Sequence, residues 1–352
     1  MVIGAHIFGE DLEQSLLLNA LKKTALLQPE NKIILFANVP LTNLPQNCLQ
    51  VNIYPKPKNK LLLYYWFTYK LPKLLLKYSI SSFISNGGML ASSISIKQFL
   101  FIESKDLFEE LNSFFKKRLK NAVAIAQTVF VTDEVIADNI SKKFPTHLSK
   151  IKQLNFSLNE NNILLTLNET EAVKQKYTDG FDYYLFSVNA SSKVHLILLL
   201  KSFSQLKKWQ KTSLKMILLF KNEIDERLLP DFKNYKYKNE VVILKETREN
   251  VLQLTAAAFT LIFFADYKSR GNLYNALNNN IPVIVADTFT NNLLYKSAVS
   301  YAAPTVDGLA LQLQLIYKNE IYKKQLLQQA NIYLTQFDSH VASQKFAEAV
   351  SN

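Results

Sequence analysis

Short apolar segments alternate along the chain with longer segments in which apolar residues recur every three or four positions. In the first half, the short segments are residues 2–8, 33–37, 51–54, 82–84, 99–102 and 128–131. Residues 12–27, 62–77 and 107–126 between them have the periodicity of amphipathic helices. Such alternation is typical of parallel sheets covered by helices. The pattern therefore predicts an α/β fold.

A second series of the same kind follows a polar stretch at residues 155–162 and a helix that ends near Asp179-Gly180. Its predicted strands are residues 183–188, 214–220, 241–244, 261–264 and 283–286, with helices starting at Leu196, Arg248, Tyr274, Leu309 and Tyr322. We predict two Rossmann-like doubly wound domains, residues 1–160 and 161–335, facing each other across a cleft that binds the ligands. Residues 336–352 are predicted to form a C-terminal helix that packs back on the first domain.

Composition and charge narrow the functional classes. The 352 residues contain one cysteine, Cys48, which excludes an internal disulfide framework and a multi-cysteine zinc site. The 41 Lys and Arg residues outnumber the 29 Asp and Glu residues, so the formal charge is +12 and favours phosphate-rich partners or an anionic membrane face. No motif typical of nucleic-acid binding is present, and we expect no nucleic-acid partner.

The sequence predicts neither a signal peptide nor a membrane span, so we expect a soluble protein. The first residues lack the basic region and the length of a signal peptide. The most apolar stretch, residues 61–78, is interrupted by Lys70, Pro72, Lys73 and Lys77, which argues against a membrane span. The same lysines, next to the aromatic run 64–69, suit contact with a membrane surface or a lipid-linked acceptor. We expect a cytoplasmic protein, peripheral at the inner membrane face where it meets such an acceptor.

Eight segments spread over nearly the whole chain stand in the order and at the spacing of one known family. They are residues 2–6, 64–77, 85–88, 97–102, 126–134, 174–186, 254–263 and 280–284. In this arrangement the chain resembles the retaining GT-B glycosyltransferases of group 1, the mannosyl- and glucosyltransferase-like type. The resemblance implies transfer of a hexose from a nucleotide-diphosphate sugar to a glycan or lipid-linked acceptor, without a metal or a cofactor besides the donor substrate.

The resemblance places cations where the diphosphate of the donor would lie. Lys193 stands at the arginine position of the family's His-Pro-Arg-Lys-Asn motif, and Lys221 stands at a further basic position. Lysine and arginine side chains bind phosphate oxygens through charge-assisted hydrogen bonds. The glycines that accompany both positions in the family are replaced by Val188 and Phe220. Two candidate nucleotide-sugar-binding cations therefore remain without the close backbone approach that glycine permits.

The most diagnostic family motif, a pair of glutamates around a glycine-rich turn, is changed most. Counting from Gly271 and Pro282 places Lys268 and Asn275 at the two glutamate positions. Asn275 can donate or accept a hydrogen bond at a ribose hydroxyl, and Lys268 and Arg270 can bind phosphate. These three residues complete the candidate nucleotide-sugar site.

The acceptor side has one candidate catalytic group. Where many family members carry His-Asp after the strand at residues 97–102, this chain has Glu103, which can accept a hydrogen bond or proton from an acceptor hydroxyl. A solvated glutamate at a strand end is the alternative interpretation. The four histidines are scattered without a partner at metal-ligand spacing, so we expect no metal site.

Two functions follow from this degenerate active site. The first is a retaining hexosyltransferase that acts in polysaccharide or glycoconjugate biosynthesis. The second is a catalytically inactive GT-B-fold protein that serves as a binding module or as the partner of another glycosyltransferase. The residues alone leave both open, because the framework segments favour catalysis while the changed motifs oppose it.

Overall fold

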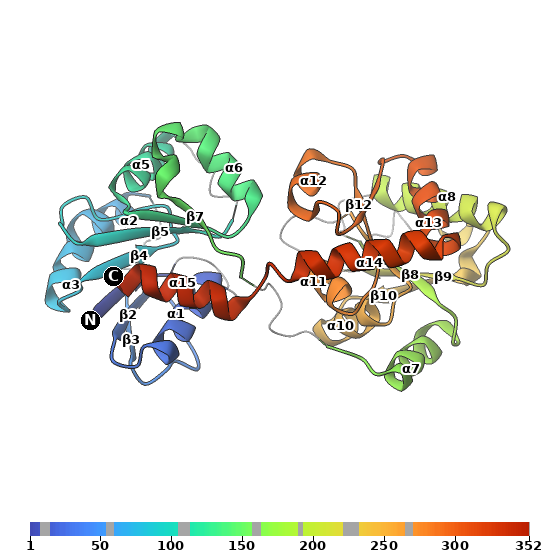
Figure 1. Ribbon diagram of the computed structural model, residues 1–352, viewed down its shortest axis with the longest axis horizontal. Coiled ribbons are helices and arrows are strands. Elements are labelled where there is room, and N and C mark those ends of the chain that lie inside the picture. The colour runs from blue at the N-terminus through green and yellow to red at the C-terminus, as the bar shows by residue number, and fades with distance from the viewer. Residues whose placement is uncertain are drawn as a thin grey trace. The chain divides into compact units, whose positions relative to one another are not determined.

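The computed structural model describes residues 1–7, 15–53, 60–104, 113–156, 163–188, 193–220, 232–264 and 270–351 (Figure 1). The chain divides into two compact units. Residues 1–156 together with 337–352 form the first unit, and residues 157–336 form the second. Each unit has its own sheet and its own core.

The first unit contains a seven-stranded sheet in which every described pair of neighbouring strands is parallel. The strand order is β3-β2-β1-β4-β5-β6-β7. The bounds are Val2–His6 (β1), Lys32–Ala37 (β2), Cys48–Asn52 (β3), Ser82–Ser85 (β4), Lys97–Ile102 (β5), Thr128–Val131 (β6) and Ile151–Gln153 (β7).

The second unit contains a six-stranded sheet, again parallel at each described pair, in the order β10-β9-β8-β11-β12-β13. The bounds are Tyr183–Val188 (β8), Lys215–Phe220 (β9), Val241–Lys245 (β10), Thr260–Phe263 (β11), Val283–Ala286 (β12) and Ser300–Ala302 (β13). Counted within the unit, this order is 3-2-1-4-5-6, the order of the doubly wound Rossmann fold. The predicted α/β class and the two doubly wound sheets are confirmed.

The edge strand β10 was predicted well, but three other edge strands were not. β3 begins three residues before the predicted segment, and the short strands β7 and β13 were not predicted. Strands at a sheet edge are covered incompletely, so their sequence carries a weaker apolar signal. β3, for example, leaves Leu49 exposed by 42% and contains Gln50 and Asn52.

Two helices of the first unit, α1 (Leu16–Leu27) and α6 (Glu134–Lys143), begin at side chains that satisfy free backbone N–H groups. Ser15 caps α1 through Leu18, and Asp133 caps α6 by accepting from the backbone of Ile136 at 2.9 Å. The other helices are α2 (Lys60–Tyr65), the π-helical segment η2 (Trp66–Lys70), α3 (Leu71–Lys77), α5 (Ser113–Ile125), the 3-10 helix η3 (Pro145–Lys150) and α15 (Ser339–Ser351).

Strand alternation assigns these helices to the two faces of the first sheet. Odd-numbered residues of β1 and β2, such as Ile3 and Leu35, belong to a core that also contains buried residues of α1 and α15. Even-numbered His6 and Phe36 instead contact Trp66 of η2, with ring centroids 5.1 and 6.2 Å apart. The α2–η2–α3 run therefore covers the face opposite α1 and α15, and Figure 1 shows α15 lying beside α1.

The C-terminal helix is part of the first core. Phe346 of α15 lies between Phe101 of β5 and Phe130 of β6, with centroid distances of 5.9 and 5.4 Å. Its side chain is fully buried. The last residues of the chain thus complete a core formed mainly by the first 156.

The second unit also has helices on both faces of its sheet. The bounds are Leu167–Thr178 (α7), Lys193–Trp209 (α8), Lys238–Glu240 (η5), Arg248–Ala256 (α10), Arg270–Asn278 (α11), Phe289–Tyr295 (α12), Val306–Lys318 (α13) and Glu320–Leu334 (α14). Two neighbouring tyrosines of β8 anchor opposite faces: the Tyr183 hydroxyl donates to the carbonyl of Leu254 in α10, and the Tyr184 hydroxyl donates to that of Leu313 in α13. Burial raises the pKa of both phenols, so each hydroxyl keeps its proton for these bonds.

Candidate functional site

Each sheet has one point at which the strand order reverses. In the first sheet this point lies between β1 and β4, and in the second it lies between β8 and β11. Ligands of doubly wound folds bind beside the carboxyl ends of the strands at such a point. The residues that follow β1, β4, β8 and β11 are therefore the first place to look for a functional site.

Glu103, the candidate catalytic residue, directly follows β5 and is held by three donors. Its carboxylate accepts from the Ser15 hydroxyl at 3.0 Å, from the backbone of Leu16 at 2.7 Å and from the side-chain amide of Asn86 at 2.5 Å. A carboxylate at the start of a helix is stabilised by the free N–H groups there. Glu103 is thus not simply solvated: it connects the start of α1 to the ends of β4 and β5.

His6 ends β1 and forms a second polar contact at the same edge. Its Nδ1 lies 3.1 Å from the hydroxyl of Ser85 at the end of β4, and that hydroxyl accepts from the backbone of Gly87 at 3.2 Å. The imidazole is 2% exposed and packs against the rings of Trp66 and Phe67. Burial lowers the pKa of His6 from 6.5 to about 3, so the ring is neutral.

The hydrogen bonds of Ser85 and Asn86 together fix the turn after β4. Ser85 holds the backbone of Gly87, Asn86 donates to Glu103, and Gly88 adopts a positive φ of 69° that favours glycine. The structure therefore brings Glu103 and His6 to one edge. Sequence reasoning did not select His6, although a histidine closing a buried strand was visible in the pattern.

In the second unit, two helices begin at the switch point. α8 starts at Lys193 after β8, and α11 starts at Arg270 after β11, and β8 and β11 are paired neighbours. The start of a helix presents free N–H groups and a partial positive charge that favour a phosphate. The side chains of Lys193 and Arg270 lie outside the described part of the structure, as do Lys221 and Lys268 entirely.

The four candidate cations, Lys193, Lys221, Lys268 and Arg270, all follow neighbouring strands of the second sheet. Lys221 directly follows β9, and Lys268 lies in the chain between β11 and α11. The four candidates thus follow β8, β9 and β11, which are three adjacent strands of the second sheet. Phe220, at the family's glycine position before Lys221, is buried in the core at 2% exposure.

Asn275 is placed within α11 and is completely buried. Its Nδ2 donates to the carbonyl of Leu252 in α10 at 3.2 Å, and its Oδ1 accepts from the side-chain amide of Asn279 at 3.2 Å. Asn279 in turn donates to the carbonyl of Ile163 at 2.8 Å. These contacts fasten α11, whose first residue is Arg270, to α10 and to the segment before α7.

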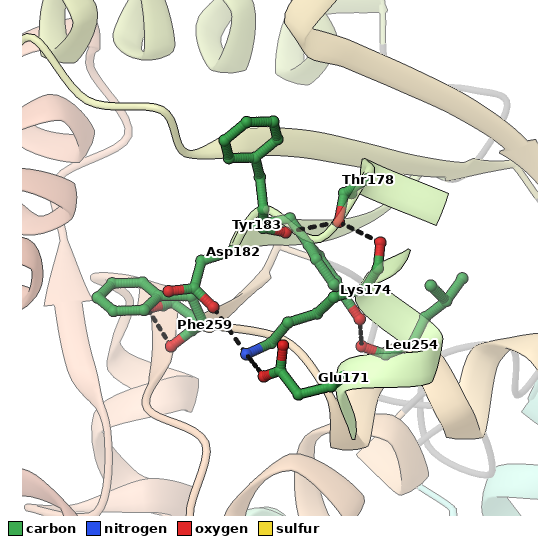
Figure 2. Close-up of polar contacts among 9 residues, drawn as sticks. Glu171, Lys174, Thr178, Asp182, Tyr183, Leu254 and Phe259 are labelled. Carbon is green, nitrogen blue, oxygen red and sulfur yellow. Dashed lines mark hydrogen bonds and ion pairs between the residues drawn. The ribbon is translucent and has the colours of Figure 1, made fainter. Parts of the chain in front are cut away.

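A shallow hollow of about 390 Å³ lies at the other edge of the second sheet, where β8 and β9 begin. In it, Lys174 of α7 reaches Glu171 and Asp182, each at 2.9 Å (Figure 2). Phe259 and Tyr317 also line the hollow. The Lys174 side chain is only 16% exposed, but both carboxylates are exposed, and ion pairs at a protein surface contribute little to stability, about 0–1 kcal/mol. Because the hollow lies at the amino ends of the strands, it is separate from the switch point.

Two features would be visible in the described residues if they were present there: a cluster of metal ligands and a membrane-spanning helix. Among those residues, no three His, Cys, Asp or Glu side chains gather as the ligands of a metal ion would. No described helix is both long and apolar enough to cross a lipid bilayer.

Comparison with known proteins identifies the fold. No protein-family model matches the chain, and no curated protein matches it. A glycosyltransferase from Rickettsia africae matches in structure with a TM-score of 0.72 and 12% identity, covering 99% of this chain and 97% of that chain. HepE from Anabaena in complex with UDP gives a TM-score of 0.71 and 13% identity over 99% of both chains.

A third solved glycosyltransferase structure also matches the fold of this chain. WaaG, a glycosyltransferase involved in lipopolysaccharide biosynthesis, matches over 100% of both chains with a TM-score of 0.64 and 12% identity. The chain has the GT-B glycosyltransferase fold. At these identities the likeness establishes the fold, while the reaction and the substrates depend on the site.

Proposed function

We propose that this GT-B-fold chain binds a nucleotide-diphosphate sugar at the carboxyl edge of its second sheet. It transfers the hexose to a glycan or lipid-linked acceptor with retention at the anomeric carbon. The observation that carries the proposal is the switch point between β8 and β11, where α8 and α11 both begin. The full-length fold match to HepE, which was solved with UDP, supports nucleotide binding by this fold.

The chemistry at this edge is electrostatic. When the sugar leaves, negative charge develops on the diphosphate, and cations with backbone N–H groups already in place stabilise it without reorganisation. Lys193, Lys221, Lys268 and Arg270 supply that charge in the proposal. Asn275 acts by holding α11 in position, because its amide bonds within the domain.

The acceptor would approach the first sheet. An ionised carboxylate offers about four acceptor positions, and the described residues supply three donors to Glu103. We propose that the remaining position accepts a hydrogen bond from the acceptor hydroxyl. The reaction is placed in the cytoplasm, which the single cysteine fits.

One observation favours the second function, a catalytically inactive protein. The two glutamate positions of the family motif carry Lys268 and Asn275, and Asn275 is buried with its amide engaged inside the domain. Such a protein would bind a nucleotide, a glycan or another glycosyltransferase in a polysaccharide or glycoconjugate pathway without turning over a donor.

The test is calorimetry and thermal unfolding with UDP, GDP and their hexose conjugates, followed by measurement of nucleotide release. A ligand at about 100 times its Kd should stabilise the folded state by about 2.7 kcal/mol. K193Q should weaken that binding, whereas K201Q, which removes an exposed lysine of the same helix, should not. Binding with turnover supports the transferase, and binding without turnover supports the inactive protein. No binding at about 1 mM ligand, on the order of the weak-binding limit, would refute the transferase and favour an inactive protein that binds a glycan or another glycosyltransferase.

A further inference from the structure

The helical run formed by α2, η2 and α3 has an outer stripe that is aromatic, aliphatic and basic. Its inner face is fixed in the core by Trp66, Phe67, Leu71 and Leu75. The outward residues recur at intervals of three and four, and three of them are large apolar side chains: Tyr65 (44% exposed), Tyr69 (55%) and Leu76 (71%). Exposed Lys70, Lys73 and Lys77 lie among them.

The π-helical segment keeps this stripe continuous. The rings of Tyr65 and Tyr69 stand 5.6 Å apart, so the two aromatic groups lie side by side along the surface. The backbone remains helical at the junctions of η2 with α2 and α3. The run is therefore one rigid element presenting a single outward face.

α5 extends the basic surface beside this run. The guanidinium of Arg118 lies 4.1 Å from the ring of Tyr64 in α2, and Phe114 packs against the same ring at 6.1 Å. Lys116, Lys117 and Lys120 of α5 are exposed.

Neither element contains an acidic residue to offset this charge. Residues 60–78 and 113–125 contain four Lys or Arg residues each, eight in all, and no Asp or Glu. The whole chain has a formal charge of +12. Two adjoining elements thus concentrate a large part of the excess on one surface.

We propose that this surface, defined by the outer stripe of α2–η2–α3 and the exposed lysines of α5, docks on an anionic lipid bilayer. Tyrosine rings and leucine side chains insert favourably at the boundary between headgroups and acyl chains, and lysines reach the phosphates above it. Bases of a single-stranded nucleic acid can stack on tyrosine rings, but a nucleic acid offers no apolar layer for Leu76. The combination of charge and exposed apolar groups therefore fits a lipid surface. The inference does not depend on transferase activity.

The test is co-sedimentation of the full chain with vesicles of phosphatidylcholine alone or mixed with phosphatidylglycerol, at about 100 mM salt, where charge is still felt over about 10 Å. Two variants separate the contributions: K70Q/K73Q/K77Q removes charge, and Y65S/Y69S/L76S removes apolar groups. K201Q/K318Q/K324Q, which alters three exposed lysines of the second unit, is the charge-matched control.

The wild type and the control should bind the anionic vesicles and not the neutral ones. Each lysine near an anionic surface contributes roughly a fivefold factor, so the triple charge variant should bind on the order of 100-fold more weakly. The apolar variant should also lose binding while keeping its salt dependence, and circular dichroism should show both variants folded.

Three results would overturn the proposal. The first is absence of wild-type binding to anionic vesicles, and the second is equal loss in the control. The third is full binding by the apolar variant together with equally tight binding of duplex DNA, which would indicate a general polyanion surface.

Discussion

Acidification should destabilise the first unit through His6. The imidazole is buried at the end of β1 beside Trp66, and burial lowers its pKa from 6.5 to about 3. Above pH 6.5 the ring is neutral in both the folded and the unfolded chain. Below that value His6 is protonated in the unfolded chain but stays neutral in the folded chain. The free energy of unfolding therefore decreases as the pH falls, until about pH 3.

The size of the loss follows from the same values. One unit of pKa difference corresponds to about 1.36 kcal/mol. Between pH 7.5 and pH 4.5 the loss should therefore reach about 2.7 kcal/mol, a large part of the stability of a single domain. The H6N variant cannot titrate and keeps an acceptor near the Ser85 hydroxyl. It should be less stable at pH 7.5 but should lack this part of the acid dependence.

Urea unfolding followed by tryptophan fluorescence measures the effect. The chain has two tryptophans, buried Trp66 in the first unit and exposed Trp209 in the second. In a W209F background the signal therefore reports the unit that contains His6. A second readout is the ring resonance of His6, which should not titrate above pH 4. Equal acid dependence in wild type and H6N, or titration of the ring near pH 6.5, would refute the assignment.

Three further changes test the packing and the helix starts. F346A should cost about 3–5 kcal/mol by emptying the core contact of α15, and limited proteolysis should then release the residues after 337. E103Q should cost about 1–3 kcal/mol, because the amide places a donor against groups that themselves donate; denaturation of the variant at neutral pH measures it. T166A removes the capping box that Thr166 forms with Glu169 at the start of α7, and thermal unfolding of the second unit should show a loss of about 1 kcal/mol. If T166A unfolds like the wild type, this cap contributes nothing to the rest of the unit.

The sequence predicted the central strands well because they are buried on both faces. Val283–Ala286 and Thr128–Val131, for instance, are nearly uniform apolar runs, and such runs have few alternatives to a parallel strand. Ser300–Ala302 is short and includes two hydroxyl side chains, and its place at the sheet edge follows only from its pairing with β12.

The candidate site could be predicted only in part. The family resemblance made Lys193 and Arg270 candidate phosphate ligands, shortly before the helix starts predicted at Leu196 and Tyr274, and the structure begins α8 and α11 at Lys193 and Arg270. The resemblance could not show that Asn275 would be buried against Leu252, because that contact depends on how α11 packs on α10. His6 was overlooked for the same reason: Ser85 is 79 positions away in sequence.

The sequence by itself determined the alternation of strands and helices and the overall excess of positive charge, since each depends on local periodicity or composition. Only the tertiary structure decided which polar groups meet. The contacts of Glu103 with Ser15 and Asn86, and the packing of Phe346 in a core built by the first 156 residues, join segments far apart in the chain. Such contacts form only when the parallel order of the strands brings their ends to one edge, and no local pattern records that order.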